Sequence, residues 1–94
     1  MAALDLFGRR WSLRILWELR DGSVGARALI ERCEGISSSV LYARLRELLG
    51  AGIVAKDPAG DYELTWLGQG LGVALAPLDA WAQEWASEPK FSRL

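Results

Sequence analysis

Histidine is absent from this 94-residue sequence, and cysteine occurs only once, as Cys33. A structural zinc site uses about four cysteine or histidine ligands, and a Ser-His-Asp triad needs a histidine as its base. A single cysteine also excludes an internal disulfide and is typical of a reducing compartment. We therefore expect no metal, no cofactor and no enzymatic activity.

Long apolar segments are also missing. No run approaches the ~18 apolar residues that a membrane-spanning helix needs. The N-terminal residues 1–5 lack the basic and then apolar pattern of a signal peptide. A chain of 94 residues is long enough to bury one core. We therefore expect a single soluble, cytoplasmic domain over residues 1–94, with no membrane partner.

Charge is nearly balanced overall, at −1, but it is unevenly distributed along the chain. Residues 9–46 contain eight arginines and four acidic residues, whereas residues 47–94 contain three basic and seven acidic residues. Such asymmetry is compatible with a basic face toward a polyanion. It is equally compatible with two oppositely charged halves attracting each other, so charge alone leaves nucleic-acid binding open.

Apolar residues in the first half recur at helical spacing in separate segments. A short apolar start over residues 4–7 is interrupted by glycine, and residues 11–19 and 26–33 then predict two helices. A third helix is predicted over residues 37–49, with Ser37 as its N-cap and its leucines facing inward. The first half of the chain therefore predicts a compact helical core.

The apolar period then changes from 3.6 to 2. Residues 53–55 read as a strand, 57–60 as a turn, and 62–66 as a returning strand, with Tyr62, Leu64 and Trp66 on one face. A long helix is expected over about residues 67–86, with a kink at Pro77. This order predicts a mainly α winged helix-turn-helix fold with a three-helix core, a two-stranded wing and a long C-terminal helix. In that architecture the helix before the wing enters the major groove of DNA.

Three segments, in this order, resemble the HxlR family of bacterial winged-helix regulators, a branch close to the MarR type. They are LDLFGRRWSLRILWELRDG, GISSSVLYARLRELLGAGIV and YELTWLGQGL followed by LDAWAQEW. The similarity runs from about Leu4 to Trp85. It implies a DNA-binding transcriptional regulator, a repressor that acts as a homodimer on an inverted-repeat operator, with helix 37–49 in the major groove.

The resemblance also implies which segments pair in the dimer. Family dimers usually associate through the N-terminal segment and the last helix. The corresponding residues here are Leu4, Leu6, Phe7, Leu71, Leu75, Leu78, Trp81 and Trp85.

Hydroxyl and guanidinium groups on helix 37–49 are suited to contact phosphates and base edges. The residues predicted to bind DNA are Ser37, Ser38, Ser39, Tyr42, Ala43, Arg44 and Arg46 of this helix, together with Arg10 and Lys56. An alternative interpretation makes the same residues a solvated helix face with local ion pairs. The chain would then be a winged-helix protein-interaction module that has lost DNA binding.

Arg9, Arg10 and Arg14 surround the start of helix 11–19, which often lies close to the DNA backbone. They are candidates for phosphate contacts. Arg14 is slightly better explained as part of the solvent face of its helix.

Five tryptophans are many for a chain of this size. For Trp81 and Trp85, one turn apart, we favour a role as dimer anchors. One alternative is that they line a cavity for a planar aromatic effector, which would be a small-molecule partner. The other is that they simply cover the core, which is the interpretation we favour for Trp11. Because five indole rings cannot all be buried in so small a core, we expect some ring edges at the surface.

Two further features are best explained without a ligand. The segment WLGQGLG superficially resembles a dinucleotide-binding loop, but its spacing differs from G-x-G-x-x-G and no second parallel strand follows. Its glycines instead allow close packing at a helix start. Cys33 falls on the apolar face of its helix, so we expect a small core residue rather than a sensor thiol.

Overall fold

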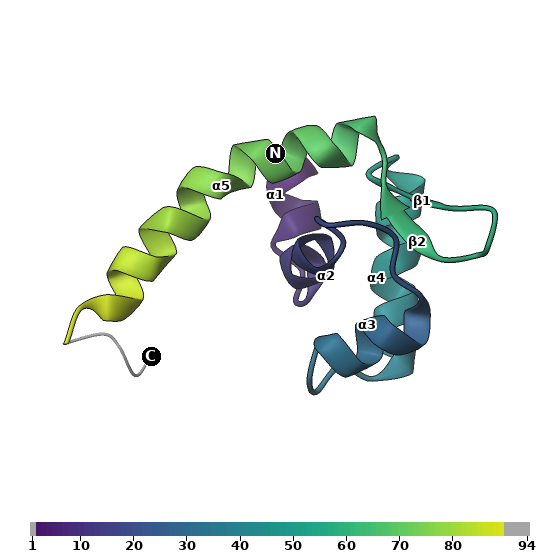
Figure 1. Cartoon of the computed structure of the whole chain (residues 1–94), viewed down its shortest axis with the longest axis horizontal. Helices are drawn as coiled ribbons and strands as arrows, with labels where there is room; N and C mark the ends of the chain where they lie inside the picture. The colour runs from purple at the N-terminus through teal and green to yellow at the C-terminus, as the bar shows by residue number, and fades with distance from the viewer. Residues whose placement is uncertain (1, 90–94) are drawn as a thin grey trace.

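The structure, a computed structural model, describes residues 2–89; Met1 and residues 90–94 of the predicted domain lie outside this range. The four predicted helices and the hairpin follow in the predicted order, and the short apolar start of the sequence analysis forms an additional helix before them (Figure 1). The elements are α1 (Ala2–Phe7), α2 (Ser12–Glu18), α3 (Ala26–Arg32), α4 (Ser38–Gly50), β1 (Val54–Lys56), β2 (Tyr62–Leu64) and α5 (Trp66–Ser87).

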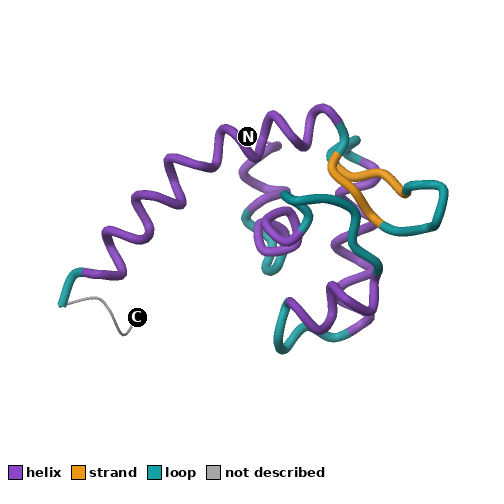
Figure 2. Tube along the Cα trace, viewed as in Figure 1, coloured by secondary structure: helices purple, strands orange, loops and turns teal. Residues whose placement is uncertain are grey.

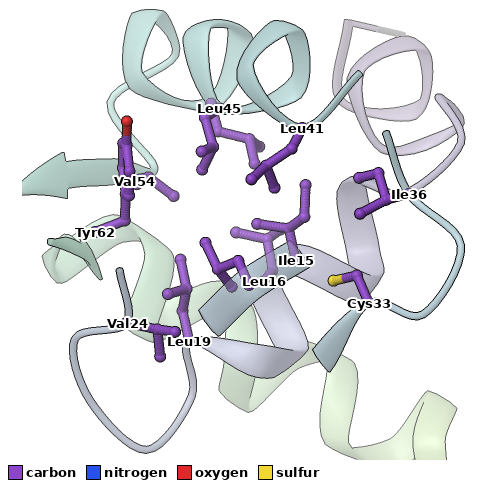
Figure 3. Close-up of a cluster of buried hydrophobic side chains, with 12 residues drawn as sticks. Ile15, Leu16, Leu19, Val24, Cys33, Ile36, Leu41, Leu45, Val54 and Tyr62 are labelled. Carbon is purple, nitrogen blue, oxygen red and sulfur yellow. The ribbon is translucent and has the colours of Figure 1, made fainter. Parts of the chain in front are cut away.

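The core is one cluster of buried side chains from α2, α3, α4, the hairpin and their connecting segments (Figure 3). Leu41, Leu45 and Leu48 form the buried stripe of α4, as the sequence predicts, and each is at most 1% exposed. Cys33 is fully buried in the same cluster. Within residues 2–89, α5 contributes no large side chain to this buried set.

Helix α4 begins where the sequence predicts. The Ser37 hydroxyl accepts a hydrogen bond from the Val40 amide at 3.2 Å and satisfies one of the unpaired amides of the first turn.

The wing is a short antiparallel hairpin in which Val54 pairs with Leu64 and Lys56 with Tyr62 (Figure 2). In its turn, an Asp57 carboxylate oxygen accepts hydrogen bonds from the Ala59 and Asp61 amides, both at 2.9 Å. Tyr62 also forms an antiparallel bridge to Val24, with two backbone hydrogen bonds of 2.9 Å. Sequence periodicity gives no sign of this bridge, because Val24 lies in a segment without alternating pattern.

The predicted second strand is too long. Trp66 does not share a strand face with Tyr62 and Leu64; it is the first residue of α5 and is 83% exposed. The strand ends because the Thr65 hydroxyl caps α5, accepting a hydrogen bond from the Gly68 amide at 3.2 Å. An apolar residue at an alternating position cannot reveal that change from strand to helix.

Helix α5 is 22 residues long and includes Pro77, the predicted site of a kink, within its length; in Figure 1 the helix is curved. Its first turns pack on α2 and β2. Its C-terminal half extends away from the core, so that the side chains of this half are largely exposed.

Candidate nucleic-acid interface

The outward face of α4 carries hydroxyl groups and one guanidinium. Ser38, Tyr42 and Arg46 recur every four residues and are exposed, as is Ser39. Tyr42 is 47% exposed although it is a large side chain. Arg46 has no ion-pair partner within residues 2–89. This face can therefore donate hydrogen bonds to phosphate oxygens and base edges.

Ser37 and Ala43 are less available for contacts than the exposed residues of this face. The Ser37 hydroxyl is occupied by the helix cap and lies 3.2 Å from the Ser39 hydroxyl. Ala43 is half-buried. Their contacts with DNA remain predictions.

Arg44 lies on the inner flank of α4, apart from the outward face. Its side chain is 18% exposed, and its guanidinium donates to a Glu47 carboxylate oxygen at 2.6 Å. The Nε atom of Arg44 is buried and has no hydrogen-bond partner in the described part of the chain. The prediction that Arg44 contacts DNA is untested, and this geometry favours Arg46 instead.

Two other arginines, near the start of α2, also form ion pairs within the chain. Arg9 pairs with the second carboxylate oxygen of Glu47 at 3.3 Å. Arg14 pairs with Glu18 at 2.9 Å and donates to the Arg32 carbonyl at 2.8 Å. Both guanidiniums therefore have partners within the chain that a phosphate would have to replace.

The remaining predicted cations are exposed. The Arg10 guanidinium lies 5.3 Å from the Trp11 ring centroid, and the Lys56 ammonium lies 5.5 Å from that of Tyr62. Neither has an acidic partner among residues 2–89. Both stay candidates for phosphate contacts.

Arg27 is a candidate that sequence reasoning missed. It is exposed, has no ion pair in the described range, and is the second residue of α3. The first helix of a helix-turn-helix crosses the DNA backbone, so its N-terminal residues lie near phosphates. The sequence predicts helix 26–33, so the place of Arg27 near the start of that helix was already apparent from the sequence.

The residues predicted to form a dimer divide into two groups. Leu6, Phe7 and Leu71 are half-buried against the core, and Leu75 is half-buried as well. The other members are exposed by 39% to 66%; they are Leu4, Leu78, Trp81 and Trp85. On α5, three large apolar residues that were not predicted are also exposed, namely Trp66, Leu67 and Val73.

Helix α5 borders an apolar groove of about 590 Å³, with α2 on its other side. The groove is lined mainly by Leu13, Leu16 and Trp17 of α2 and by Leu71, Leu75 and Leu78 of α5. The Trp17 ring is 41% exposed, and the Arg20 guanidinium lies 3.9 Å from its centroid. Further along α5, the Trp81 and Trp85 rings stack with centroids 6.1 Å apart and planes 5° apart.

Residues 2–89 contain no group of three or more His, Cys, Asp or Glu side chains placed to bind a metal. A helix able to cross a bilayer is also not found in this range.

A small helical core, an exposed helix preceded by a shorter one, and a hairpin wing together define a winged helix-turn-helix fold. The HxlR-like helix-turn-helix family model matches residues 6–90. The chain belongs to that family, as the sequence resemblance predicted.

Its curated relatives are transcriptional regulators. An uncharacterised HTH-type regulator of Bacillus subtilis (strain 168), YvaP, is 32% identical over 95% of this chain and 87% of its own length. A regulator of Mycobacterium bovis is 33% identical over 94% of this chain, which spans only 59% of that relative. The family and these relatives make this chain a transcriptional regulator rather than an enzyme.

Solved structures agree with the fold. The quinone-bound YodB of B. subtilis matches with a TM-score of 0.82 and 32% identity, covering 89% of this chain and 94% of YodB. A MarR-family regulator from Enterococcus faecalis V583 matches with a TM-score of 0.79 and 31% identity, covering 99% and 88%.

Proposed function

We propose that this regulator is a homodimer that binds an inverted-repeat operator by placing α4 of each subunit in the major groove. The observation that carries the proposal is the outward face of α4, where Tyr42 and Arg46 are exposed beside two serines. With about three phosphates neutralised per subunit, a dimer would give a log–log salt slope near −5. We place it in the bacterial cytoplasm as a repressor.

Dimerisation is supported by the composition and exposure of α5. From Trp66 to Ser87 the helix contains no basic residue and only two acidic ones, and a helix that is apolar on most of its faces needs cover. One exposed face runs through Leu67, Leu78, Trp81 and Trp85 at helical spacing. In a two-fold dimer the same patch serves both subunits, so one contact covers both copies.

The experiment that tests DNA reading compares two arginines on the same helix. Arg46→Ala is expected to weaken binding of a promoter duplex by about 1–3 kcal/mol per subunit and to reduce the salt slope by about 1 per subunit. Arg44→Ala removes the same charge from the inner flank of α4 and is expected to leave the slope unchanged. Fluorescence anisotropy across a range of salt concentrations measures both. Equal losses of slope in the two variants would count against this assignment of the reading face.

The alternative function is a protein-interaction module without DNA binding. The acidic residues of the wing are the observation in its favour. The wing contains Asp57, Asp61 and Glu63 and one basic residue, Lys56, and Glu63 accepts a hydrogen bond from the Ser23 hydroxyl at 3.2 Å. Absence of DNA binding at low salt by a dimeric protein would favour this alternative.

An aromatic effector is a second proposal, favoured by the quinone in the YodB structure and by the exposed Trp17 ring at the α2–α5 groove. In this chain the effector would bind without a covalent bond to the thiol. Cys33 is fully buried, and burial raises the pKa of its thiol, an effect that nearby Arg14 only partly offsets.

Cys33 is therefore expected to resist electrophiles, because the thiolate is the reactive form and the sulfur is covered. Iodoacetamide should label the folded protein at least about 100-fold more slowly than the protein in denaturant, since labelling requires rare unfolding. Intact-mass spectrometry over time gives both rates. Similar rates in the two conditions would contradict the burial of the thiol in the folded protein.

A further inference from the structure

The segment Gly8–Trp11, the α1–α2 linker, is held in a fixed conformation. Within residues 2–89, Trp11 is the one non-glycine residue with a positive φ, at 78°. A bulky residue in this region is strained and persists only when its surroundings fix it. Backbone hydrogen bonds from Gly8 to Leu4 (2.8 Å) and from Ser12 to Arg9 (3.2 Å) join the linker to α1 and α2.

The same linker lies beside the segment that leads into α4. A Cβ atom at Gly35 would lie 3.9 Å from the outer edge of the Trp11 ring. Gly35 lies between α3 and α4 and has a φ of +99°. The indole ring therefore lies beside the turn that precedes the recognition helix, α4.

A second contact between the linker and α4 lies near the C-terminal end of α4. Glu47 accepts a hydrogen bond from Arg44 of its own helix at 2.6 Å, and its other carboxylate oxygen lies 3.3 Å from the Nε atom of Arg9 in the linker, an ion-pair contact without hydrogen-bond geometry. One carboxylate thus joins α4 to the linker, and Arg44 holds that carboxylate in place. Neither arginine belongs to the exposed stripe of Ser38, Tyr42 and Arg46.

We propose that the α1–α2 linker positions the recognition helix relative to α1, with Glu47 as the positioning residue. This inference rests on the proposed function and on the predicted dimer contact, which includes Leu4, Leu6 and Phe7 of α1. A connection from α1 to the turn before α4 and to Glu47 near its C-terminal end would determine where each recognition helix lies relative to the dimer axis. It therefore sets the half-site spacing that the dimer accepts, which for two helices in successive major grooves is about 10 base pairs.

The test measures spacing discrimination: the ratio of affinities for two duplexes. One is selected from a random pool by the wild-type protein, and the other is the same duplex with one base pair inserted between its half-sites. Arg9 is 58% exposed, so its pair with Glu47 contributes at most about 1 kcal/mol, equivalent to about five-fold. Glu47→Gln and Arg9→Ala are each expected to reduce the ratio by up to about five-fold. The double variant should reduce it no further, because both changes remove one interaction.

The control is Glu34→Gln, which removes an exposed acidic charge that has no ion pair among residues 2–89. It should leave the ratio at the wild-type value. Affinity for a single half-site should stay within about two-fold in Glu47→Gln and Glu34→Gln, because neither residue is a predicted DNA contact. Arg9 is itself a candidate phosphate contact, so Arg9→Ala is judged by the ratio alone. An unchanged ratio in Glu47→Gln and Arg9→Ala, or an equal loss on the half-site in Glu47→Gln, would overturn the proposal.

Hydrogen exchange of the free protein separates this inference from the proposed function. If the wild-type protein selects no duplex, the proposed function fails, yet the attachment of α4 remains measurable. Glu47→Gln and Arg9→Ala should both speed amide exchange in the C-terminal half of α4, by up to about five-fold. Unchanged exchange in both variants would overturn the attachment itself.

Discussion

Gly68→Ala is expected to destabilise the protein by about 3 kcal/mol and to lower its Tm by roughly 10–20 °C. A Cβ atom at this position would overlap the Ile53 carbonyl oxygen and lie 3.2 Å from two atoms of Leu64. The Ile53 oxygen already accepts a hydrogen bond from the Thr65 amide at 3.0 Å. Because Thr65 caps α5, moving Ile53 away weakens the cap as well.

Gly72→Ala is the matched control in the same helix. Nothing lies within 4 Å of a Cβ at Gly72, and alanine is the better helix former, so this variant should gain about 0.5–1 kcal/mol. Thermal and urea unfolding followed by circular dichroism measure both changes. Opposite signs are the expected result, whereas equal stability would mean that α5 does not approach the hairpin as closely as described.

Trp81→Glu is expected to weaken dimerisation by at least about 2 kcal/mol, or roughly 30-fold in Kd, and to weaken operator binding with it. The Trp81 ring is 56% exposed and stacks on Trp85, so the subunit's own fold loses little when it is replaced. In the proposed dimer the ring is covered by the second subunit. A charge there would be buried without a partner.

Ala80→Glu places the same charge at the neighbouring exposed position, about 100° further around α5. It should leave the dimer intact. Analytical ultracentrifugation over a concentration series gives the Kd of both variants, and circular dichroism verifies that the helices are retained. If Trp81→Glu stays dimeric at concentrations where the wild type does, the interface lies elsewhere.

Local signals in the sequence were sufficient for most of the fold. The 3.6-residue period of leucines and the Ser37 cap located α4 correctly, because both act within one helix. Alternation over residues 62–66 failed at Trp66, since the Thr65 cap and the period of α5 compete with the strand pattern at the same residues. The Val24–Tyr62 bridge joins residues 38 positions apart, which no local pattern reports.

The candidate site was predictable as a face but less so as individual contacts. The inward leucines of helix 37–49 leave Ser38, Tyr42 and Arg46 on the opposite face, and all three are exposed. Helical spacing could not show that Glu47 joins Arg44 to Arg9, because Arg9 comes from a different segment. On α5 the leucine spacing did not separate the half-buried Leu71 and Leu75 from exposed Leu78, since α5 is apolar around most of its circumference.

The most direct test of the central claim is selection of duplexes from a random pool by the purified wild-type protein, followed by sequencing. The account predicts enrichment of an inverted repeat whose half-sites are centred about 10 base pairs apart, and loss of that enrichment in Arg46→Ala. Enrichment of a single unrepeated site, or no enrichment even at low salt, would contradict a dimer that reads DNA through α4.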